Sequence, residues 1–137
     1  MRKIIHSLLG LLLAMTAVSV AAEPIAMIVN KANSASSLSS SVISDIYRGR
    51  LRNWANGSKI QPVNFPVDSE FRIAFYNKVL GESPTAEFNL PGTPELFKTS
   101  IRKSANSVMR FVNRFEKAIG YVPLSAVDDS VKVVYTF

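Results

Sequence analysis

Hydrophobic positions along the chain form two kinds of segment, short continuous runs and wider-spaced stripes, and the two kinds alternate. Four runs have the length of a strand: residues 24–30, 59–65, 118–122 and 131–137. The first is apolar throughout and rich in β-branched residues, which is typical of a strand buried on both faces of a sheet. Pro62 lies in the second run, so we expect that strand at a sheet edge or beginning at Val63. Gly120 in the third run indicates close approach by another backbone or a ligand.

The stripes between these runs have the spacing of amphipathic helices. They predict helices over residues 39–48, 69–80 and 94–103 and from 107 onward. Ser39 or Ser40 is the expected N-cap of the first helix, and Asp68 or Ser69 that of the second, while Gly49 and Gly81 are expected to end them. The proline-rich residues 82–94 predict a long irregular connection.

This alternation predicts an α/β fold with a mixed sheet of about four to five strands flanked by helices. Residues 23–137 are enough for one domain with a core of ordinary size. The chain has no cysteine, so packing and not disulfide bonds must stabilise it. Trp54 is expected to anchor the loop after the first helix to the core or its rim, in preference to stacking on a ligand.

The first 22 residues have the pattern of a secretory signal peptide. Arg2 and Lys3 precede an uncharged run from Ile4 to Val20, and small residues end the segment at Ala22. A membrane anchor is the alternative, but the run falls short of the ~20 residues that a spanning helix needs. We therefore expect cleavage after Ala22, a periplasmic location and no membrane insertion of residues 23–137; a secreted product is the second possibility.

Removal of Arg2 and Lys3 leaves 14 of the 16 basic residues against 10 acidic ones, a net charge of +4 for residues 23–137. This moderate excess suits a small anionic ligand or an acidic partner surface, and nucleic acid is not an expected partner in the periplasm. The loop at the carboxyl end of the first strand contains Ser36 and Ser37, which can face a ligand or simply form a flexible connection.

Catalytic and metal chemistry have little support in these residues. The single histidine, His6, lies in the predicted leader, and cysteine is absent. The carboxylates show no pairing beyond neighbours in sequence, as at Asp128 and Asp129. We therefore expect no enzyme activity, no metal site and no cofactor.

Three segments occur in an order and spacing that point to a family: I-Y-R-G-R-L-R-N-W-A-N-G at 46–57, P-V-N-F-P-V-D-S-E-F-R-I-A-F at 62–75 and A-I-G-Y-V at 118–122. Together they resemble the PstS-like phosphate-binding periplasmic proteins of ABC transporters, in the type 2 solute-binding protein superfamily. The resemblance spans about residues 25–136 and implies two α/β lobes that close on a ligand. This chain resembles largely the second lobe, and so a short single-lobe relative.

The resemblance also implies an anion site at the start of the second helix. Ser69 and Arg72 match the family's Ser-Gly-Thr-Arg-like turn, and with Asp68 and the serines at 36 and 37 they are the candidate ligand-binding residues. Phe65 stands where the family has an arginine, and Glu70 and Phe71 replace the glycine and the threonine. A carboxylate at a helix N-terminus repels a bound anion, so only weak binding of a phosphate-like ion is expected.

Two functions follow from these observations. The first is a periplasmic solute-binding-like protein with weak anion binding. The alternative is a protein-interaction or sensory accessory subunit that no longer binds phosphate. Its partner would be a membrane transporter, a sensor, another lobe or a second copy, docked on the open cleft face or on the loop from Tyr47 to Trp54.

Overall fold

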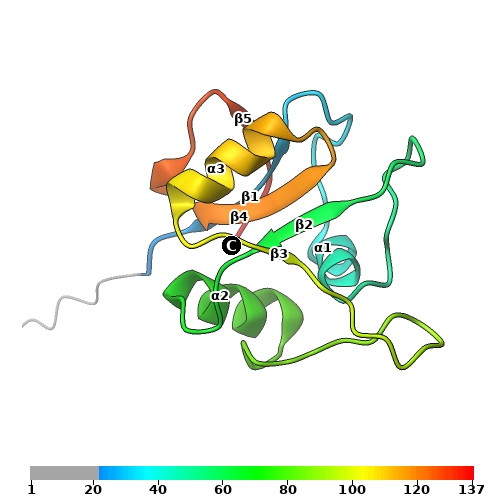
Figure 1. The fold of residues 1–137 in the computed structure, drawn as a ribbon. Coiled ribbons are helices and arrows are strands. Elements are labelled where there is room, and N and C mark those ends of the chain that lie inside the picture. Colours follow the sequence, from blue (N-terminus) through cyan, green and yellow to red (C-terminus); the bar gives the residue numbers. More distant parts are fainter. Residues whose placement is uncertain (1–21) are drawn as a thin grey trace, which may run out of the picture.

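The computed structural model describes residues 22–137 and contains one five-stranded sheet with helices on both faces (Figure 1). The strand order across the sheet is β3-β2-β4-β1-β5. The strands are β1 (Ile25–Asn30), β2 (Gln61–Asn64), β3 (Ser100–Ile101), β4 (Ala118–Pro123) and β5 (Val131–Thr136).

Strand directions make the sheet mixed, as predicted. β1 runs antiparallel to both β4 and β5, while β2 runs parallel to β4 and to β3. β1 and β2 therefore point in opposite directions, and the loops that follow them leave opposite ends of the sheet. All six residues of β1 are buried, which confirms the prediction of a strand covered on both faces.

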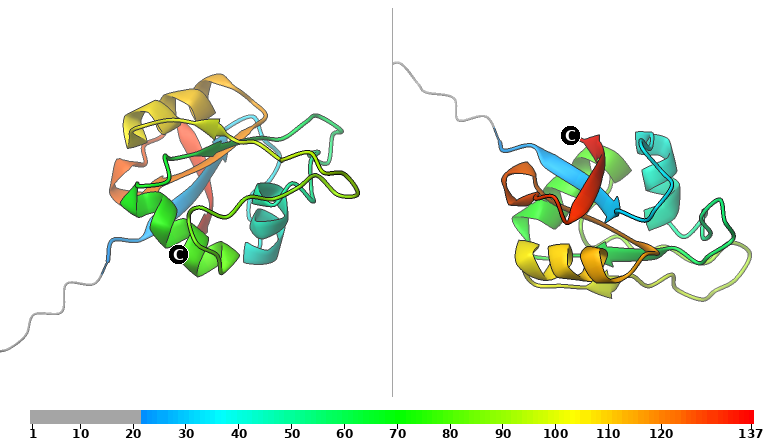
Figure 2. Two further views of the ribbon diagram at one scale, coloured as in Figure 1. Left: turned by 60° about the horizontal axis from the view of Figure 1, so that its bottom comes forward. Right: turned by 90° about the horizontal axis from the view of Figure 1, so that it is seen from above.

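The helices are α1 (Ser40–Tyr47), α2 (Glu70–Phe75), which continues into the π-helical segment η1 (Tyr76–Leu80), and α3 (Ala105–Arg114); η2 (Leu124–Ala126) is a short 3-10 turn. Figure 2 shows α3 on one face of the sheet and α1 and α2 on the other. Two consecutive residues of β4 face opposite sides of the sheet. Gly120 lies under α3, and Tyr121 packs against the aromatic rings of Tyr47 and Phe75 on the opposite face.

Local residues set the helix ends largely as the sequence predicts. The Ser39 hydroxyl accepts a hydrogen bond from the Val42 amide, and Ser69 caps α2 in the same way through the Phe71 amide. Gly49 after α1 and Gly81 after η1 have positive φ angles of 75° and 66°. These left-handed residues stop each helix where a side chain would be strained.

The predicted helix over residues 94–103 is wrong. Residues 88–97 instead form a hairpin-like loop, in which the Phe97 amide donates to the Phe88 carbonyl and the Leu90 amide to the Glu95 carbonyl. The chain then pairs with β2 as the short edge strand β3. The following helix begins at Ala105 and not at Ser107, because the Ser104 hydroxyl accepts from the Ser107 amide and caps it earlier.

Residues 1–21 of the predicted signal peptide (residues 1–22) lie outside the described residues. Within residues 22–137 no helix is long and apolar enough to cross a membrane.

Candidate functional site

The turn between β2 and α2 places the predicted anion-binding residues at the carboxyl end of β2. The Ser69 amide donates to the Pro66 carbonyl at 3.0 Å, and the Ser69 hydroxyl accepts from the Phe71 amide at 3.2 Å. Asp68 and Glu70 on either side are exposed to solvent. The Ser69 hydroxyl keeps its own proton free for a ligand, but two carboxylates flank it.

Arg72 points inward and not toward solvent. Its Nη1 donates to the Phe65 carbonyl at 3.0 Å, and its Nε donates to the Pro84 carbonyl at 2.9 Å. The guanidinium carbon lies 4.6 Å from the centre of the Tyr76 ring, and the residue is only 9% exposed. Arg72 therefore ties α2 to the end of β2 and to the loop after η1, and brings a positive charge beneath the first turn of α2.

A buried polar network lies next to Arg72, at the end of β2. The Asn64 side-chain Nδ2 donates to the Tyr76 hydroxyl at 2.9 Å, and the side-chain Oδ1 accepts from the Tyr121 hydroxyl and from the Phe65 amide. Asn64 is fully buried. Asn64 was not among the predicted site residues, although an asparagine between the apolar Val63 and Phe65 is the signal that could have identified it.

The tyrosines of this region serve as fixed hydrogen-bond donors. Burial raises the pKa of Tyr121 far above its usual value, and burial together with the neighbouring Tyr121 raises the pKa of Tyr47. The Tyr47 hydroxyl donates to the Val63 and Ile119 carbonyls at 2.8 and 3.3 Å. Both phenols therefore stay protonated at neutral pH, and their role here is to satisfy buried groups.

Ser36 and Ser37 lie in a different part of the molecule. Both are exposed, and the next residue, Leu38, donates from its amide to the Val134 carbonyl of β5. β5 and β2 are separated in the sheet by β1 and β4. The structure brings Asp68, Ser69 and Arg72 together but does not bring the two serines to them.

The loop after α1 is held by its own side chains. Trp54 donates from Nε1 to the Lys117 carbonyl at 2.9 Å and packs against the core, which confirms its predicted anchoring role. Arg48 pairs with Glu82 at 3.4 Å, and Arg50 pairs with Asp45 at 3.7 Å. Arg52 differs from these two arginines, because its Nε is buried and has no hydrogen-bond partner in the described part of the chain.

Comparison with protein families gives a match over residues 13–134 to the PBP superfamily domain. The chain belongs to this family. Among solved structures, an ABC-type phosphate transport receptor from Vibrio cholerae is 23% identical with a TM-score of 0.68, over 82% of this chain and 45% of the receptor. PstS from Borrelia burgdorferi is 15% identical with a TM-score of 0.66, over 82% of this chain and 46% of PstS.

A Clostridium perfringens protein assigned as a phosphate ABC transporter substrate-binding protein, with bound phosphate, is 30% identical with a TM-score of 0.65. It aligns over 82% of this chain and 44% of its own length. This PBP-domain chain thus spans less than half the length of these relatives, and it is a short relative of phosphate ABC transporter binding proteins. No curated protein sequence matches it.

The described residues hold no group of three or more His, Cys, Asp or Glu side chains that could bind a metal ion. By their names, these solved relatives are a phosphate transport receptor and a substrate-binding protein, and neither name describes an enzyme.

Proposed function

We propose that the chain is a periplasmic, non-catalytic solute-binding protein of single-lobe form, whose direct contact with phosphate-like oxyanions is weak. Family membership and the relatives' binding of phosphate support the class of ligand. The low affinity is inferred from the position of Arg72, whose Nη1 and Nε both donate to backbone carbonyls. Its charge can attract an anion, but two of its donors are already engaged.

The proposed contacts are the Ser69 hydroxyl and the backbone amides of Asp68 and Glu70, with Arg72 acting through its charge. Each charge-assisted hydrogen bond contributes about 1.5–3 kcal/mol, so two or three of them, opposed by Asp68 and Glu70, leave a net of about 4 kcal/mol and a millimolar dissociation constant. Ser36 and Ser37 are not part of this proposed site.

A titration of residues 23–137 with sodium phosphate and sodium sulfate, followed by backbone amide NMR, tests the proposal. We expect shifts over residues 68–72 that saturate at millimolar anion. Glu70→Gln removes one exposed carboxylate and should tighten binding several-fold, because the repulsion of the anion falls. Glu95→Gln is the control, since Glu95 is also exposed but lies in the loop of residues 88–97.

Two results would refute this proposal. The first is an absence of shifts at tens of millimolar of either anion, and the second is micromolar binding that Glu70→Gln leaves unchanged.

A second candidate function is a protein-interaction or sensory accessory subunit that serves a membrane transporter or sensor. The observation that favours it is a set of six basic side chains on β3, α3 and their ends, none of which forms an ion pair within residues 22–137. The partner on this face is either a different protein or a second copy of this chain. Sedimentation of residues 23–137 distinguishes the two, because a monomer at all concentrations would exclude self-association and leave a different protein as the partner.

A further inference from the structure

The net positive charge of residues 23–137 comes from one short segment. Residues 98–117 contain six Lys and Arg and one acid, Glu116, a net of +5, whereas residues 23–137 carry 14 minus 10, or +4. The rest of the domain therefore has 8 basic and 9 acidic residues, a net of −1. We call the six basic residues of this segment the basic strip: Lys98, Arg102, Lys103, Arg110, Arg114 and Lys117.

The charges of the basic strip are not neutralised inside the molecule. The ion pairs of the described residues join Arg48 to Glu82 and Arg50 to Asp45, and neither involves the strip. Two of its guanidinium groups are nevertheless held in place. Arg102 lies 4.6 Å from the Phe111 ring centre, and Arg114 lies 5.4 Å from the Phe115 ring centre. Stacking of this kind orients the donors before a partner arrives, which lowers the entropic cost of binding.

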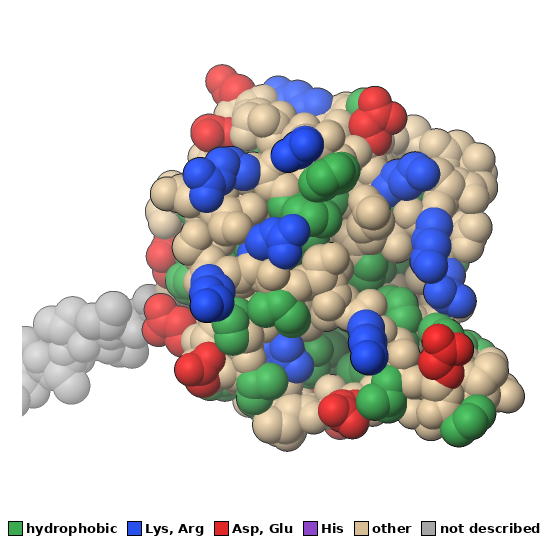
Figure 3. Space-filling view, viewed as in Figure 1, with side chains coloured by type: hydrophobic (Ala, Val, Ile, Leu, Met, Phe, Trp, Pro, Cys, Tyr) green, Lys and Arg blue, Asp and Glu red, His purple; other side chains and the backbone are tan. Residues whose placement is uncertain are grey.

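Apolar side chains are exposed between these cations. Ile101 in the edge strand β3 and Phe115 after α3 are 43% and 37% exposed. Figure 3 shows Lys and Arg spread over this face around hydrophobic side chains, with Asp and Glu toward its margins. Arginine and aromatic residues together are typical of protein interfaces, where they carry much of the binding energy.

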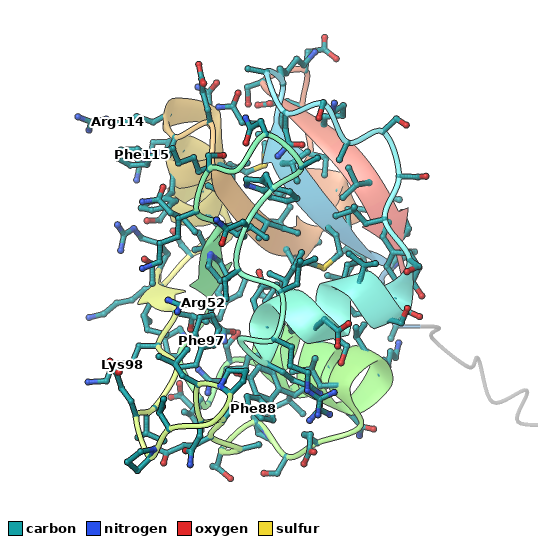
Figure 4. The ribbon with its side chains drawn as sticks, turned by 90° about the vertical axis from the view of Figure 1, so that its right-hand side faces the viewer. Arg52, Phe88, Phe97, Lys98, Arg114 and Phe115 are labelled. Carbon is teal, nitrogen blue, oxygen red and sulfur yellow. The ribbon has the colours of Figure 1, made fainter. Side chains whose placement is uncertain are left out.

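A hollow of about 620 Å³ adjoins the strip at Lys98. Its walls include two further cations, Arg52 and Lys59, together with Pro62 and Phe97, and its single acid is Glu95. Figure 4 shows Arg52 beside Phe97, and Lys98 pointing to the same side of the molecule as Arg114. A carboxylate is the group that best pairs with the guanidinium of Arg52 in this wall.

We propose that the basic strip and this hollow form a docking surface for an acidic segment of a partner protein. One partner carboxylate enters the hollow beside Arg52, and others pair with the Lys and Arg of the strip. This inference rests on the second candidate function and names its surface and its chemistry. A second copy is a poor occupant, because two copies that meet through the same strip would repel each other.

The arrangement favours a protein over an anionic membrane. The stacked guanidinium groups form a fixed array with forked donors, which suits carboxylates in defined positions. A hollow with an apolar wall fits a side chain better than it fits a mobile layer of head groups. Vesicles of phosphatidylglycerol are nevertheless included in the test as the competing partner.

The test uses residues 23–137, which contain every described strand and helix, and a synthetic peptide of alternating glutamate and phenylalanine as the probe. We expect amide NMR shifts at Arg52 and over residues 98–117, with an affinity that falls as salt rises. The double variant Lys98→Glu, Arg110→Glu should weaken peptide binding at least tenfold. The control Lys31→Glu, Lys78→Glu makes the same change in net charge at residues outside the strip and should change affinity no more than twofold.

Arg52→Gln examines the hollow separately and should weaken peptide binding severalfold while Phe97 and Ser100 lose their shifts. Its thermal melt is recorded alongside, and if it is unfolded, Lys59→Gln at the same hollow replaces it. No peptide shifts, equal loss in both double variants, or binding only to the vesicles would each overturn the proposal. Phosphate binding is read at residues 68–72, so failure of one proposal is distinguishable from failure of the other.

Discussion

Replacement of Arg72 separates a structural role from a ligand-binding role. Arg72→Met removes two charge-assisted hydrogen bonds, to the Phe65 and Pro84 carbonyls, and the contact with the Tyr76 ring. Bonds of this kind contribute about 1.5–3 kcal/mol each, and a buried carbonyl that loses its donor adds to the loss. Partial compensation by the apolar methionine leaves an expected destabilisation of about 3–5 kcal/mol.

This loss is large against the ~5–15 kcal/mol stability of a small domain. Urea unfolding followed by circular dichroism measures it as the change in the free energy of unfolding. Arg110→Met is the matched control, because Arg110 is exposed and forms no ion pair in the described chain, and it should change stability by less than about 0.5 kcal/mol.

Arg72→Lys keeps the positive charge but cannot reach both carbonyls in the same fork, so we expect a smaller loss, about 1–2 kcal/mol. A structural role for Arg72 is refuted if Arg72→Met is as stable as Arg110→Met. That role is also refuted if Arg72→Lys retains full stability but abolishes the phosphate-induced shifts, since Arg72 would then be a direct ligand.

Two further predictions concern the core. Tyr47 and Tyr121 have raised pKa values in the folded state. The stability that they contribute is therefore complete below pH ~10, the pKa of a tyrosine in the unfolded chain. Above that pH the free energy of unfolding falls by about 1.4 kcal/mol per pH unit for each tyrosine. Urea unfolding at pH 9, 10 and 11 measures this slope, and a flat profile would contradict the burial of the two phenols. Gly120→Ala would put a Cβ 2.8 Å from Val108 Cγ1, and we expect the free energy of unfolding to fall by about 1–3 kcal/mol. Gly57→Ala is the comparison, because Gly57 has a positive φ but no neighbouring atom within 4 Å, so its loss measures backbone strain without crowding.

Most of the fold could be predicted because its signals are local. Ser39, Gly49 and Gly81 mark helix ends by their own backbone chemistry, and the unbroken apolar run of β1 requires cover on both faces. The failure at residues 94–103 has a non-local cause. Phe97 pairs with Phe88 and packs against Gly49, where an added Cβ would lie 2.6 Å from its ring, and no helical pattern encodes that contact.

The candidate site was predictable only in part for the same reason. Ser69 caps α2 through an amide two residues away, which sequence spacing gives directly. The direction of Arg72 depends on Pro84, twelve residues later, and on the carbonyl of Phe65. Ser36 and Ser37 follow β1, which runs antiparallel to β4 whereas β2 runs parallel to it. The chain after β1 therefore leaves the opposite end of the sheet from α2, and neither serine encodes that direction.

The uneven placement of charge gives the molecule a large electric dipole, with the α3 side positive and the remainder close to neutral. The electric field of an acidic partner turns the α3 side of the protein toward the partner before the two molecules come into contact, so a larger share of their encounters lead to binding than random collision would give. Ionic strength should therefore slow association steeply and leave dissociation almost unchanged.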